Sequence, residues 1–206
     1  MATHPLRPGE RGTLANALVG HFPELSTVGD RPTEPGLVHR LDTGTSGLLI
    51  VARTDWAFSV LRARIRQGSV HKEYEALCEG EVRPGEITGD PVVDRQDRRR
   101  MRIEDSDGAE ARTTVRSVVL GTLGGQRVSL VTAVAPVAKR HQVRVHLAHA
   151  GHPLIGDTLY GGPAHDDYPF HALRATRVAF DHPDGGERIE VSTEGLATPG
   201  FVPDRR

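Results

Sequence analysis

Two alternating segments joined by a glycine-rich turn constrain the fold of this chain most strongly. Residues 111–120 and 126–135 each alternate apolar and polar side chains, and GTLGG (121–125) separates them. Because glycine readily adopts the positive φ that a tight reversal needs, this pattern predicts an antiparallel β-hairpin. Residues 174–180 and 187–193 repeat the arrangement around HPDGG. Successive hairpins of this kind favour a mainly antiparallel sheet over a doubly wound parallel one.

The rest of the chain adds helices and strands without a regular alternation of the two. Apolar residues recur at helical spacing in three segments, which span residues 13–22, 55–67 and 140–150. A continuous apolar run at 47–52 indicates a buried strand, and residues 69–79 alternate as a half-buried strand does. About seven strands and three helices in this order predict an α+β fold, with a mixed, mainly antiparallel sheet and flanking helices.

Composition narrows the class of protein further. The chain has 206 residues, 26 basic and 27 acidic side chains and a formal net charge of −1, so we expect one domain over residues 1–206 that acts as a monomer. A single cysteine excludes a disulfide framework and a zinc site built from several cysteines. No apolar run approaches the ~20 residues of a membrane span, and the N-terminal MATHPLRPGERGT lacks the apolar stretch of a secretion signal. These features predict a cytoplasmic protein without membrane contact.

The densest group of polar residues lies in GLVHRLDTGTSGLLIVA (36–52). Asp42 stands where an extended segment gives way to a turn rich in Gly, Thr and Ser, whose hydroxyl groups can brace its carboxylate. Arg40, two residues earlier, would share a strand face with Asp42. Asp42 is either a turn-capping aspartate with a cross-strand ion pair or a carboxylate held exposed in a cleft, and these residues alone favour the first interpretation.

Two further groups place polar side chains in apolar surroundings. Lys72 and Tyr74 fall on the same strand face as Ala76 and Cys78, so Tyr74 is either a core residue or a stacking surface for a flat ligand. Arg144 lies beside the apolar face of the third predicted helix, where an unpaired charge is costly. A carboxylate facing this guanidinium would be kept ionised and oriented.

Residues 94–107 (DRQDRRRMRIEDSD) form a dense charge run within a polar stretch that predicts a hairpin or a long loop. Its charges either compensate one another on a solvated surface or form an arm that contacts nucleic-acid phosphates. The arginines of such an arm would be Arg98, Arg99, Arg100 and Arg102. The balance of acidic and basic residues slightly favours the first interpretation.

Three motifs, taken in order, resemble the ribosomal large-subunit (RluA-like) pseudouridine synthase family. HRLDTGTSGLLIVART (39–54) is similar to that family's catalytic-aspartate motif, KEYEALCEG (72–80) to its tyrosine-bearing strand, and HQVRVHLAHAGHPLIGDTLYGG (141–162) to its arginine motif. Weaker similarity at GAEARTTVRSV (108–118) and FHALRATRVAFDHP (170–183) extends the resemblance over most of the chain.

The resemblance implies a pseudouridine synthase catalytic domain with a central active-site cleft. Asp42 would be the nucleophile, Tyr74 would stack on the target uracil and be the nearest candidate base, and Arg144 would be the partner of Asp42. The residues that it implies in substrate binding are Arg40, which would insert into the RNA stack, Leu41, Lys72, His141 and Gln142. The reaction would convert uridine in RNA to pseudouridine without a metal or cofactor, and the family favours ribosomal over transfer RNA.

The chain also departs from the family pattern. The family's earlier strands, which carry a Lys-Pro motif, would precede the region that matches MATHP, so we expect a catalytic domain that is short at its N-terminus and has no S4 domain. Ala138-Lys139 stands where the family has a Gly-Arg pair. Because lysine lacks the bidentate fork of arginine, this change predicts weaker RNA contacts nearby.

Two other functions are compatible with these residues. One is a catalytically weak RNA-binding protein that keeps the fold, to which the missing first motif and Lys139 point. The other is a metal hydrolase whose ligands would be His141, His146, His149 and His152. No carboxylate stands at ligand spacing within that helix, so we expect hydrogen-bonded histidines and no metal.

Overall fold

The computed structural model describes residues 1–5, 7, 9–104 and 111–204. Its helices are α1 (Leu14–His21), α2 (Asp55–Arg66) and α3 (Gln142–His149), with the short 3-10 helices η1 (Pro23–Thr27) and η2 (Thr158–Tyr160). Its strands are β1 (Ser46–Gly47), β2 (His71–Glu79), β3 (Gly85–Thr88), β4 (Asp90–Val93), β5 (Met101–Glu104), β6 (Arg112–Leu123), β7 (Gln126–Val134), β8 (Leu173–Asp181), β9 (Arg188–Ser192) and β10 (Phe201–Pro203).

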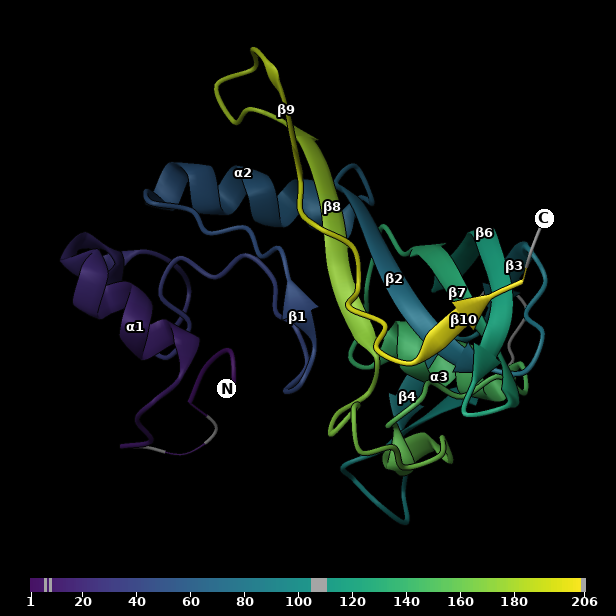
Figure 1. Ribbon diagram of the computed structural model, residues 1–206. Helices are drawn as coiled ribbons and strands as arrows, with labels where there is room; N and C mark the ends of the chain where they lie inside the picture. Colours follow the sequence, from purple (N-terminus) through teal and green to yellow (C-terminus); the bar gives the residue numbers. More distant parts are fainter. Residues whose placement is uncertain (6, 8, 105–110, 205–206) are drawn as a thin grey trace.

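One sheet forms the centre of the molecule (Figure 1). Its strand order is β1-β8-β2-β7-β6-β10, with β3 beside β6 and β9 beside β8. Among the described strands, β1 runs parallel to β8 and every other pairing is antiparallel. β4 and β5 form a separate two-stranded hairpin. The predicted α+β class with a mainly antiparallel sheet is therefore confirmed.

Both predicted hairpins are present in the sheet. β6 and β7 pair up to Leu123 and Gln126, and the turn between them consists of Gly124 and Gly125, with φ of 56° and 82°. The positive φ at both positions explains why glycine occupies them. β8 and β9 pair in the same way. The sequence analysis missed β10, because three residues that end in proline carry too short a pattern to indicate a strand.

A threonine caps the N-terminus of each of the first two helices. The Thr13 hydroxyl accepts from the main-chain N–H of Asn16, whose side chain accepts from the N–H of Thr13 in return. The Thr54 hydroxyl accepts from the N–H of Ala57 in the same way. These caps satisfy N–H groups that the first turn of each helix would otherwise leave unpaired.

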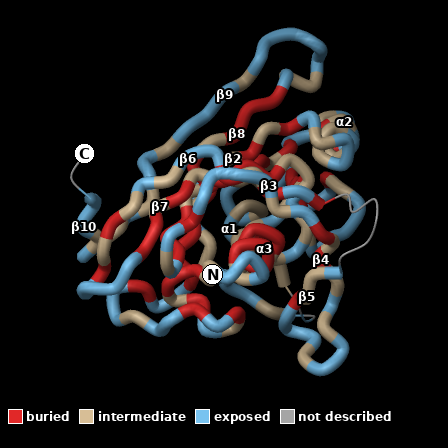
Figure 2. The backbone as a smooth tube through the Cα atoms, turned by 90° about the vertical axis from the view of Figure 1, so that its right-hand side faces the viewer, coloured by how far each residue is buried: buried red, intermediate tan, exposed pale blue. Residues whose placement is uncertain are grey.

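Two packed clusters hold the helices on the sheet. Phe58 and Leu61 of α2 pack in the first cluster with Val178 and Phe180 of β8. The second cluster surrounds α3, of which six of the eight residues are buried, and Figure 2 shows this helix enclosed by the surrounding chain. A helix so enclosed is buried on its polar as well as its apolar face, so Arg144 lies in the interior of the protein.

The predicted strand at 47–52 is wrong over most of its length. Only Ser46 and Gly47 pair with β8 as a strand within this segment. Beyond that point, the N–H of Ile50 donates to the imidazole of His39, and the N–H of Ala52 donates to the carbonyl of Gly36. Residues 36–42, likewise predicted to be extended, form turns and bends, with one antiparallel bridge from Leu37 to Val51. The prediction of burial holds for Ile50 and Ala52 only, and the other residues of 47–52 are partly or fully exposed.

The charge run at 94–107 forms a hairpin as far as it is described. β4 and β5 flank its tip, and residues 105–110 lie outside the described residues. Arg99 pairs with Asp97, and Arg102 pairs with Glu104, at 2.7 and 2.9 Å. These two ion pairs agree with the interpretation of compensating charges.

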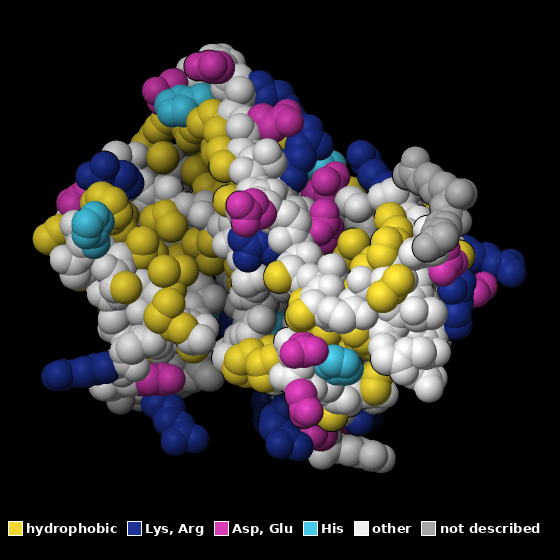
Figure 3. Space-filling view, in the orientation of Figure 1, with side chains coloured by type: hydrophobic (Ala, Val, Ile, Leu, Met, Phe, Trp, Pro, Cys, Tyr) yellow, Lys and Arg dark blue, Asp and Glu magenta, His cyan; other side chains and the backbone are white. Residues whose placement is uncertain are grey.

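An apolar groove of about 380 Å³ lies between α2 and the β8–β9 hairpin. Its lining includes Val51, Trp56, Phe180 and Ile189, and Figure 3 shows hydrophobic side chains gathered on this side of the molecule.

Within the described ranges, no helix is both long and apolar enough to cross a lipid bilayer.

The contact between β1 and β8 gives the first testable prediction. Gly47 has φ of 108°, and a Cβ added there would overlap the main-chain oxygen of Ala175. We expect Gly47→Ala to lower the free energy of unfolding by at least about 2 kcal/mol, measured by urea denaturation. Gly20→Ala is the matched control, because Gly20 lies in α1 with open space around it. It should stabilise the protein by about 0.5–1 kcal/mol, and equal effects of the two changes would contradict this account.

Candidate active site

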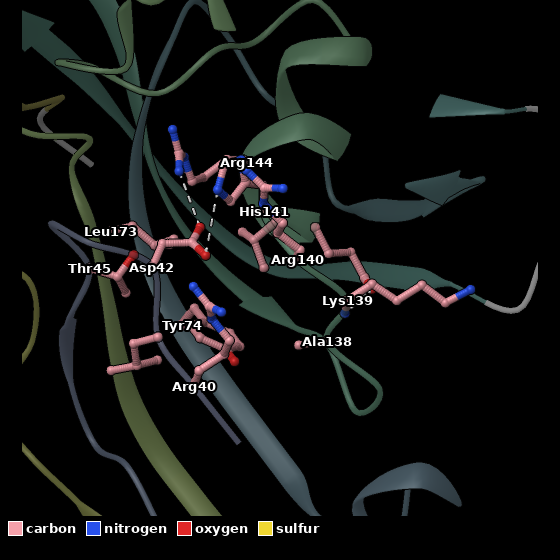
Figure 4. A pocket seen from close by; sticks show the side chains of 13 residues that line it. Arg40, Asp42, Thr45, Tyr74, Ala138, Lys139, Arg140, His141, Arg144 and Leu173 are labelled. Atoms are coloured by element: carbon pink, nitrogen blue, oxygen red, sulfur yellow. Dashed lines mark hydrogen bonds and ion pairs between the residues drawn. The ribbon is translucent and has the colours of Figure 1, made fainter. Parts of the chain in front are cut away.

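Seven of the eight predicted site residues line one pocket of about 160 Å³. They come from the segment before β1, from β2 and from the start of α3, and they are Arg40, Leu41, Asp42, Tyr74, His141, Gln142 and Arg144. Figure 4 shows Arg144 and His141 pointing toward Asp42, with Arg40 on the opposite side of its carboxylate. Lys72, the eighth, is absent from this lining and borders a neighbouring cavity.

A tight turn holds Asp42 at the wall of this pocket. The N–H of Thr45 donates to the Asp42 carbonyl at 2.9 Å, and Gly44 within the turn has φ of 96°. A Cβ at Gly44 would come within 2.9 Å of the Phe170 side chain, so both conformation and space require glycine. The Thr45 hydroxyl lies 2.7 Å from the His171 imidazole, which fixes the far end of the turn.

Arg144 joins Asp42 to a second carboxylate, Asp157. Its Nη1 donates to Oδ2 of Asp42 at 3.2 Å, while its Nε and Nη2 donate to the two oxygens of Asp157 at 2.8 Å each. The Arg144 guanidinium and the Asp157 carboxylate are buried, with side-chain exposures of 6% and 1%. Burial opposes the charged form of Arg144, but the bonds and charges of Asp157 and Asp42 raise its pKa above the ordinary value.

Asp157 is the site residue that the sequence analysis missed. It lies in GDTLYGG (156–162), which gave no indication of chemistry by itself. Main-chain bonds tie this loop to the sheet, since the N–H of Ile155 donates to Leu77 and the N–H of Ala172 donates to Ile155. The expected burial of Arg144 could have pointed to a second carboxylate, because a buried guanidinium has five donors and one carboxylate cannot satisfy them all.

His141 closes the pocket from the N-terminal end of α3. Its φ of 55° is left-handed, an uncommon conformation for a residue with a side chain. Burial lowers the pKa of His141 to about 4, so the imidazole is neutral near pH 7. The Tyr160 hydroxyl accepts from the N–H of Met101 and lies 2.7 Å from Nδ1 of His141. This contact orients the imidazole so that its Nε2 lies 3.9 Å from Oδ1 of Asp42.

Tyr74 presents its ring to the pocket from the buried face of β2. Its neighbours Lys72, Ala76 and Cys78 are buried on the same face, as the alternation predicted. Burial and the nearby charge of Asp42 raise the pKa of the Tyr74 phenol. The phenol is therefore protonated in the free protein, which favours its use as a stacking surface over its use as a base.

The polar groups of the other lining residues are either bonded within the protein or accessible to a ligand. The Gln142 amide is used within the protein, accepting from the N–H of Lys139 at 2.9 Å and donating to the carbonyl of Arg112 at 3.0 Å. Gln142 therefore braces the loop before α3. Lys139 forms an ion pair with Asp90 at 2.7 Å. The Arg40 guanidinium contacts His4 at 3.3 Å and is exposed, which leaves it accessible to a ligand.

The histidines that suggested a metal hydrolase have other partners. His146 is buried between the Thr113 hydroxyl and the Gly89 carbonyl, and His152 contacts the Glu79 carbonyl. Across the described part of the chain, no group of three His, Cys, Asp or Glu side chains is placed to hold a metal ion.

Comparison with known proteins identifies the family to which this site belongs. Residues 16–149 match the sequence model of the RNA pseudouridylate synthase family, and the chain belongs to that family. It is 39% identical over 195 residues to an uncharacterized RNA pseudouridine synthase of Chloroflexus aurantiacus, with 93% of this chain and 59% of that protein covered. It is 33% identical over 204 residues to ribosomal large subunit pseudouridine synthase D of Zymomonas mobilis, with 94% and 63% covered.

The fold gives the same result. The chain superposes on the solved structure of human RNA pseudouridylate synthase domain containing 1 with a TM-score of 0.72 and 29% identity, over 93% of this chain and 79% of that one. These matches confirm the resemblance to RluA-like synthases. The chain spans about three fifths of the length of the curated relatives that it matches.

The unequal bonding of Arg144 gives a prediction about stability. Asp157→Asn removes the buried bidentate partner and should lower the free energy of unfolding by about 3 kcal/mol. Asp42→Asn should lower the free energy of unfolding by about 1 kcal/mol or less, because Arg144 keeps its ion pair with Asp157 and Asp42 is partly exposed. Asp184→Asn, at an exposed turn, is the control. Chemical denaturation of the three variants measures this, and a cost for Asp42→Asn equal to that for Asp157→Asn would contradict the geometry.

The buried imidazoles give a prediction about pH. Burial lowers the pKa of both His141 and His171 to about 4, from 6.5 for an exposed histidine. Below pH 6.5 the unfolded chain therefore binds more protons, so the stability contributed by the neutral imidazoles is present above pH 6.5 and declines toward pH 4. We expect His171→Asn to reduce this slope by up to one proton, about 1.4 kcal/mol per pH unit. Urea denaturation between pH 4 and 7 measures the slope, and an unchanged slope would contradict the prediction.

Proposed function

We propose that this chain is an RNA pseudouridine synthase, an isomerase that converts uridine in RNA to pseudouridine. The observation that carries the proposal is the placement of Asp42, whose carboxylate faces a pocket between Tyr74 and Arg144. Family membership supplies the reaction, and this arrangement supplies a carboxylate, a stacking ring and a guanidinium around one space.

The proposed reaction rearranges bonds without gaining or losing atoms. The bond from C1′ of the ribose to N1 of uracil breaks, the base turns, and C5 forms the new bond to C1′. One proton leaves C5 and one is taken up at N1, so no oxidant, reductant or other reactant is required. Side chains that stabilise charge and move a proton are sufficient for such chemistry.

Asp42 acts on the sugar in this proposal. Its carboxylate either attacks C1′ or removes the proton on C2′ to give a glycal, and in both cases the sugar is held while the base turns. Arg144 orients the carboxylate through the 3.2 Å bond. Asp157 is a positioning residue, because it holds Arg144 without reaching the pocket lining itself.

Tyr74 stacks on the uracil as a neutral phenol. The raised pKa of Tyr74 makes it a poor acceptor for the C5 proton until it has released its own. Asp42 is regenerated as a carboxylate when C1′ joins C5, next to the carbon that must lose its proton. We therefore assign stacking to Tyr74 and proton removal to Asp42.

The exposed side of the pocket would bind the RNA around the target uridine. A uridine must leave its stack to reach Asp42, which costs a few kcal/mol. Arg40 is exposed at the pocket edge and would fill the vacated space, while Leu41 packs beside the flipped nucleotide. His141 would contact the substrate through its Nε2, whereas the bonded amide of Gln142 supports the loop instead of the RNA.

The substrate that we propose is ribosomal RNA of the large subunit. The support is the name of several relatives at about 33% identity, ribosomal large subunit pseudouridine synthase D. We further propose that the protein acts in the cytoplasm as a monomer. No metal or cofactor enters the proposed reaction.

Mapping of pseudouridine in total RNA tests the function. RNA from cells with and without this gene is treated with a carbodiimide that marks pseudouridine, because the isomerisation leaves the mass unchanged. We expect one or a few ribosomal sites to disappear without the gene and to return with the parent protein. Asp42→Asn should lower the rate at those sites by at least about a thousandfold.

Asp184→Asn, a control at an exposed turn, should restore the sites fully. Equal modification by the parent and Asp42→Asn proteins would reject the enzyme and favour an RNA-binding protein that keeps the fold. Loss of sites in transfer RNA alone would reject the ribosomal substrate.

A further inference from the structure

A second cavity, of about 270 Å³, lies directly beside the candidate active site. The two share Arg40 and Ala138 in their linings. The second cavity is bounded by the loop before Asp42, by the last turns of α2 and by the start of β2. It is therefore continuous with the edge of the pocket that would receive the flipped nucleotide.

Lys72 lies in this cavity without an anion. The residue is 2% exposed, and among the described residues no carboxylate or other acceptor lies within bonding distance of its ammonium group. Burial lowers the pKa of Lys72 to about 8, so the group still carries its proton at pH 7. An ammonium group so far withdrawn from water and without a protein anion is costly, and an anion entering the cavity beside it would supply the missing charge.

The remaining charged side chains around the cavity are also cationic. Arg62 and Arg66 lie one turn apart on α2, and Arg40 faces them across the opening. Among the residues that the structure describes, no carboxylate belongs to the lining. The nearest ion-pair partner of Arg62 is the exposed Asp30, at the long distance of 3.8 Å. Glu34 lies with Arg40 and Arg62 in the lining of an adjoining cavity, so the positive charge is without a carboxylate only within the lining of the second cavity itself.

His39 adds no positive charge to this group. Its Nε2 accepts from the N–H of Ile50. Burial and the charge of Lys72 lower the pKa of His39 to about 3, so it is neutral at physiological pH. The other neutral members of the lining, such as Val38 and Ile65, are apolar. The cavity thus presents an ammonium group at its base and guanidinium groups at its rim.

The chain's other lysine shows what Lys72 lacks. Lys72 and Lys139 are its two lysines, and Lys139 forms a 2.7 Å ion pair with Asp90. One lysine has its anion within the protein, and the other is held buried and unpaired next to the pocket. This contrast makes Lys139 an internal reference for measurements on Lys72 with inorganic phosphate.

We propose that this second cavity is a phosphate site that binds the RNA phosphodiester next to the target uridine. The inference rests on the proposed function for its ligand, since an RNA whose uridine enters the first pocket must pass its backbone over the shared Arg40 edge. A compact ammonium group and guanidinium forks are the side chains that bind phosphate best. Such contacts set the register of the RNA and leave base selection to the neighbouring pocket.

The first experiment observes the two lysines directly by NMR. Protein carrying Asp42→Asn, labelled with ¹³C at lysine Cε, is titrated with inorganic phosphate and then with RNA. We expect the Lys72 signal to move with either ligand and its pKa to rise from about 8 toward 10.5, the value of an exposed lysine. With inorganic phosphate, the Lys139 signal should stay in place, because Asp90 already pairs with Lys139. A Lys72 signal that does not respond to phosphate, or that moves together with Lys139 in the phosphate titration, overturns the phosphate site.

The second experiment identifies the phosphate. RNA oligonucleotides centred on the mapped uridine carry one neutral methylphosphonate linkage each, and their affinities are measured for the Asp42→Asn protein with and without Lys72→Met. At one linkage beside the uridine, the neutral group should weaken binding about tenfold in the parent background and leave Lys72→Met unaffected. Equal losses for both proteins at every linkage would overturn the assignment to the RNA backbone.

Substitutions on α2 provide the matched controls. Arg66→Met should lower the salt dependence of RNA binding by about 0.7 in log–log slope, as expected for one lost phosphate contact on a single strand. Arg64→Met removes the same charge from the same helix, but the Arg64 guanidinium donates to the carbonyls of Asp181 and His182 instead of facing the cavity. It should leave the slope unchanged. Equal slopes for the two variants would overturn the proposal.

Stability separates a ligand site from a structural lysine. Lys72→Met removes an unpaired buried charge, so the free protein should melt at the same temperature or higher. A lower melting temperature would show that Lys72 serves the fold and would overturn the proposal. If mapping finds no modified uridine but Lys72 still responds to inorganic phosphate, the proposed function fails and the phosphate site stands without RNA as its ligand. If mapping finds modified uridines and Lys72 does not respond to phosphate, the proposed function stands and the phosphate site fails.

Discussion

The buried guanidinium of Arg144 is the group on which the rest of the site depends. It has a bidentate partner in Asp157 and a longer single bond to Asp42. Because Asp157 already balances its charge, Arg144 orients Asp42 without needing that carboxylate for its own stability. In the proposed reaction, Asp42 would then form a bond to a sugar or take up a proton while Arg144 keeps its partner Asp157. A carboxylate that alone balanced the buried arginine could not lose its charge so easily.

Much of the fold and of the site follows from local patterns. The Gly124–Gly125 turn appears as the sequence predicts, because it depends on residues next to one another in the chain. The alternation along β2 likewise places Tyr74 on the buried face. The resemblance to RluA-like synthases brought Asp42, Tyr74 and Arg144 into one hypothesis, and the structure places all three around one pocket.

The features that sequence reasoning missed depend on distant parts of the chain. Asp157 becomes part of the site only because main-chain bonds tie its loop to the sheet and bring it to α3. The apolar run at 47–52 leaves the sheet because the loop around His39 supplies its hydrogen bonds. The alternation correctly predicted that Lys72 and Tyr74 are buried on one face of β2, but it could not show that the two side chains line different cavities. Periodicity reports which face of a strand is buried, but not which pocket that face meets.

The most direct test of the central claim is a crystal structure of the Asp42→Asn protein bound to a uridine-containing RNA. The account predicts a uridine extruded into the pocket, its ring against Tyr74, with C1′ about 3–3.5 Å from the amide that replaces the carboxylate at position 42. Arg144 should remain on Asp157 in the complex. A uridine that stays stacked in the RNA, or a C1′ that lies nearer to His141 than to position 42, would contradict the account.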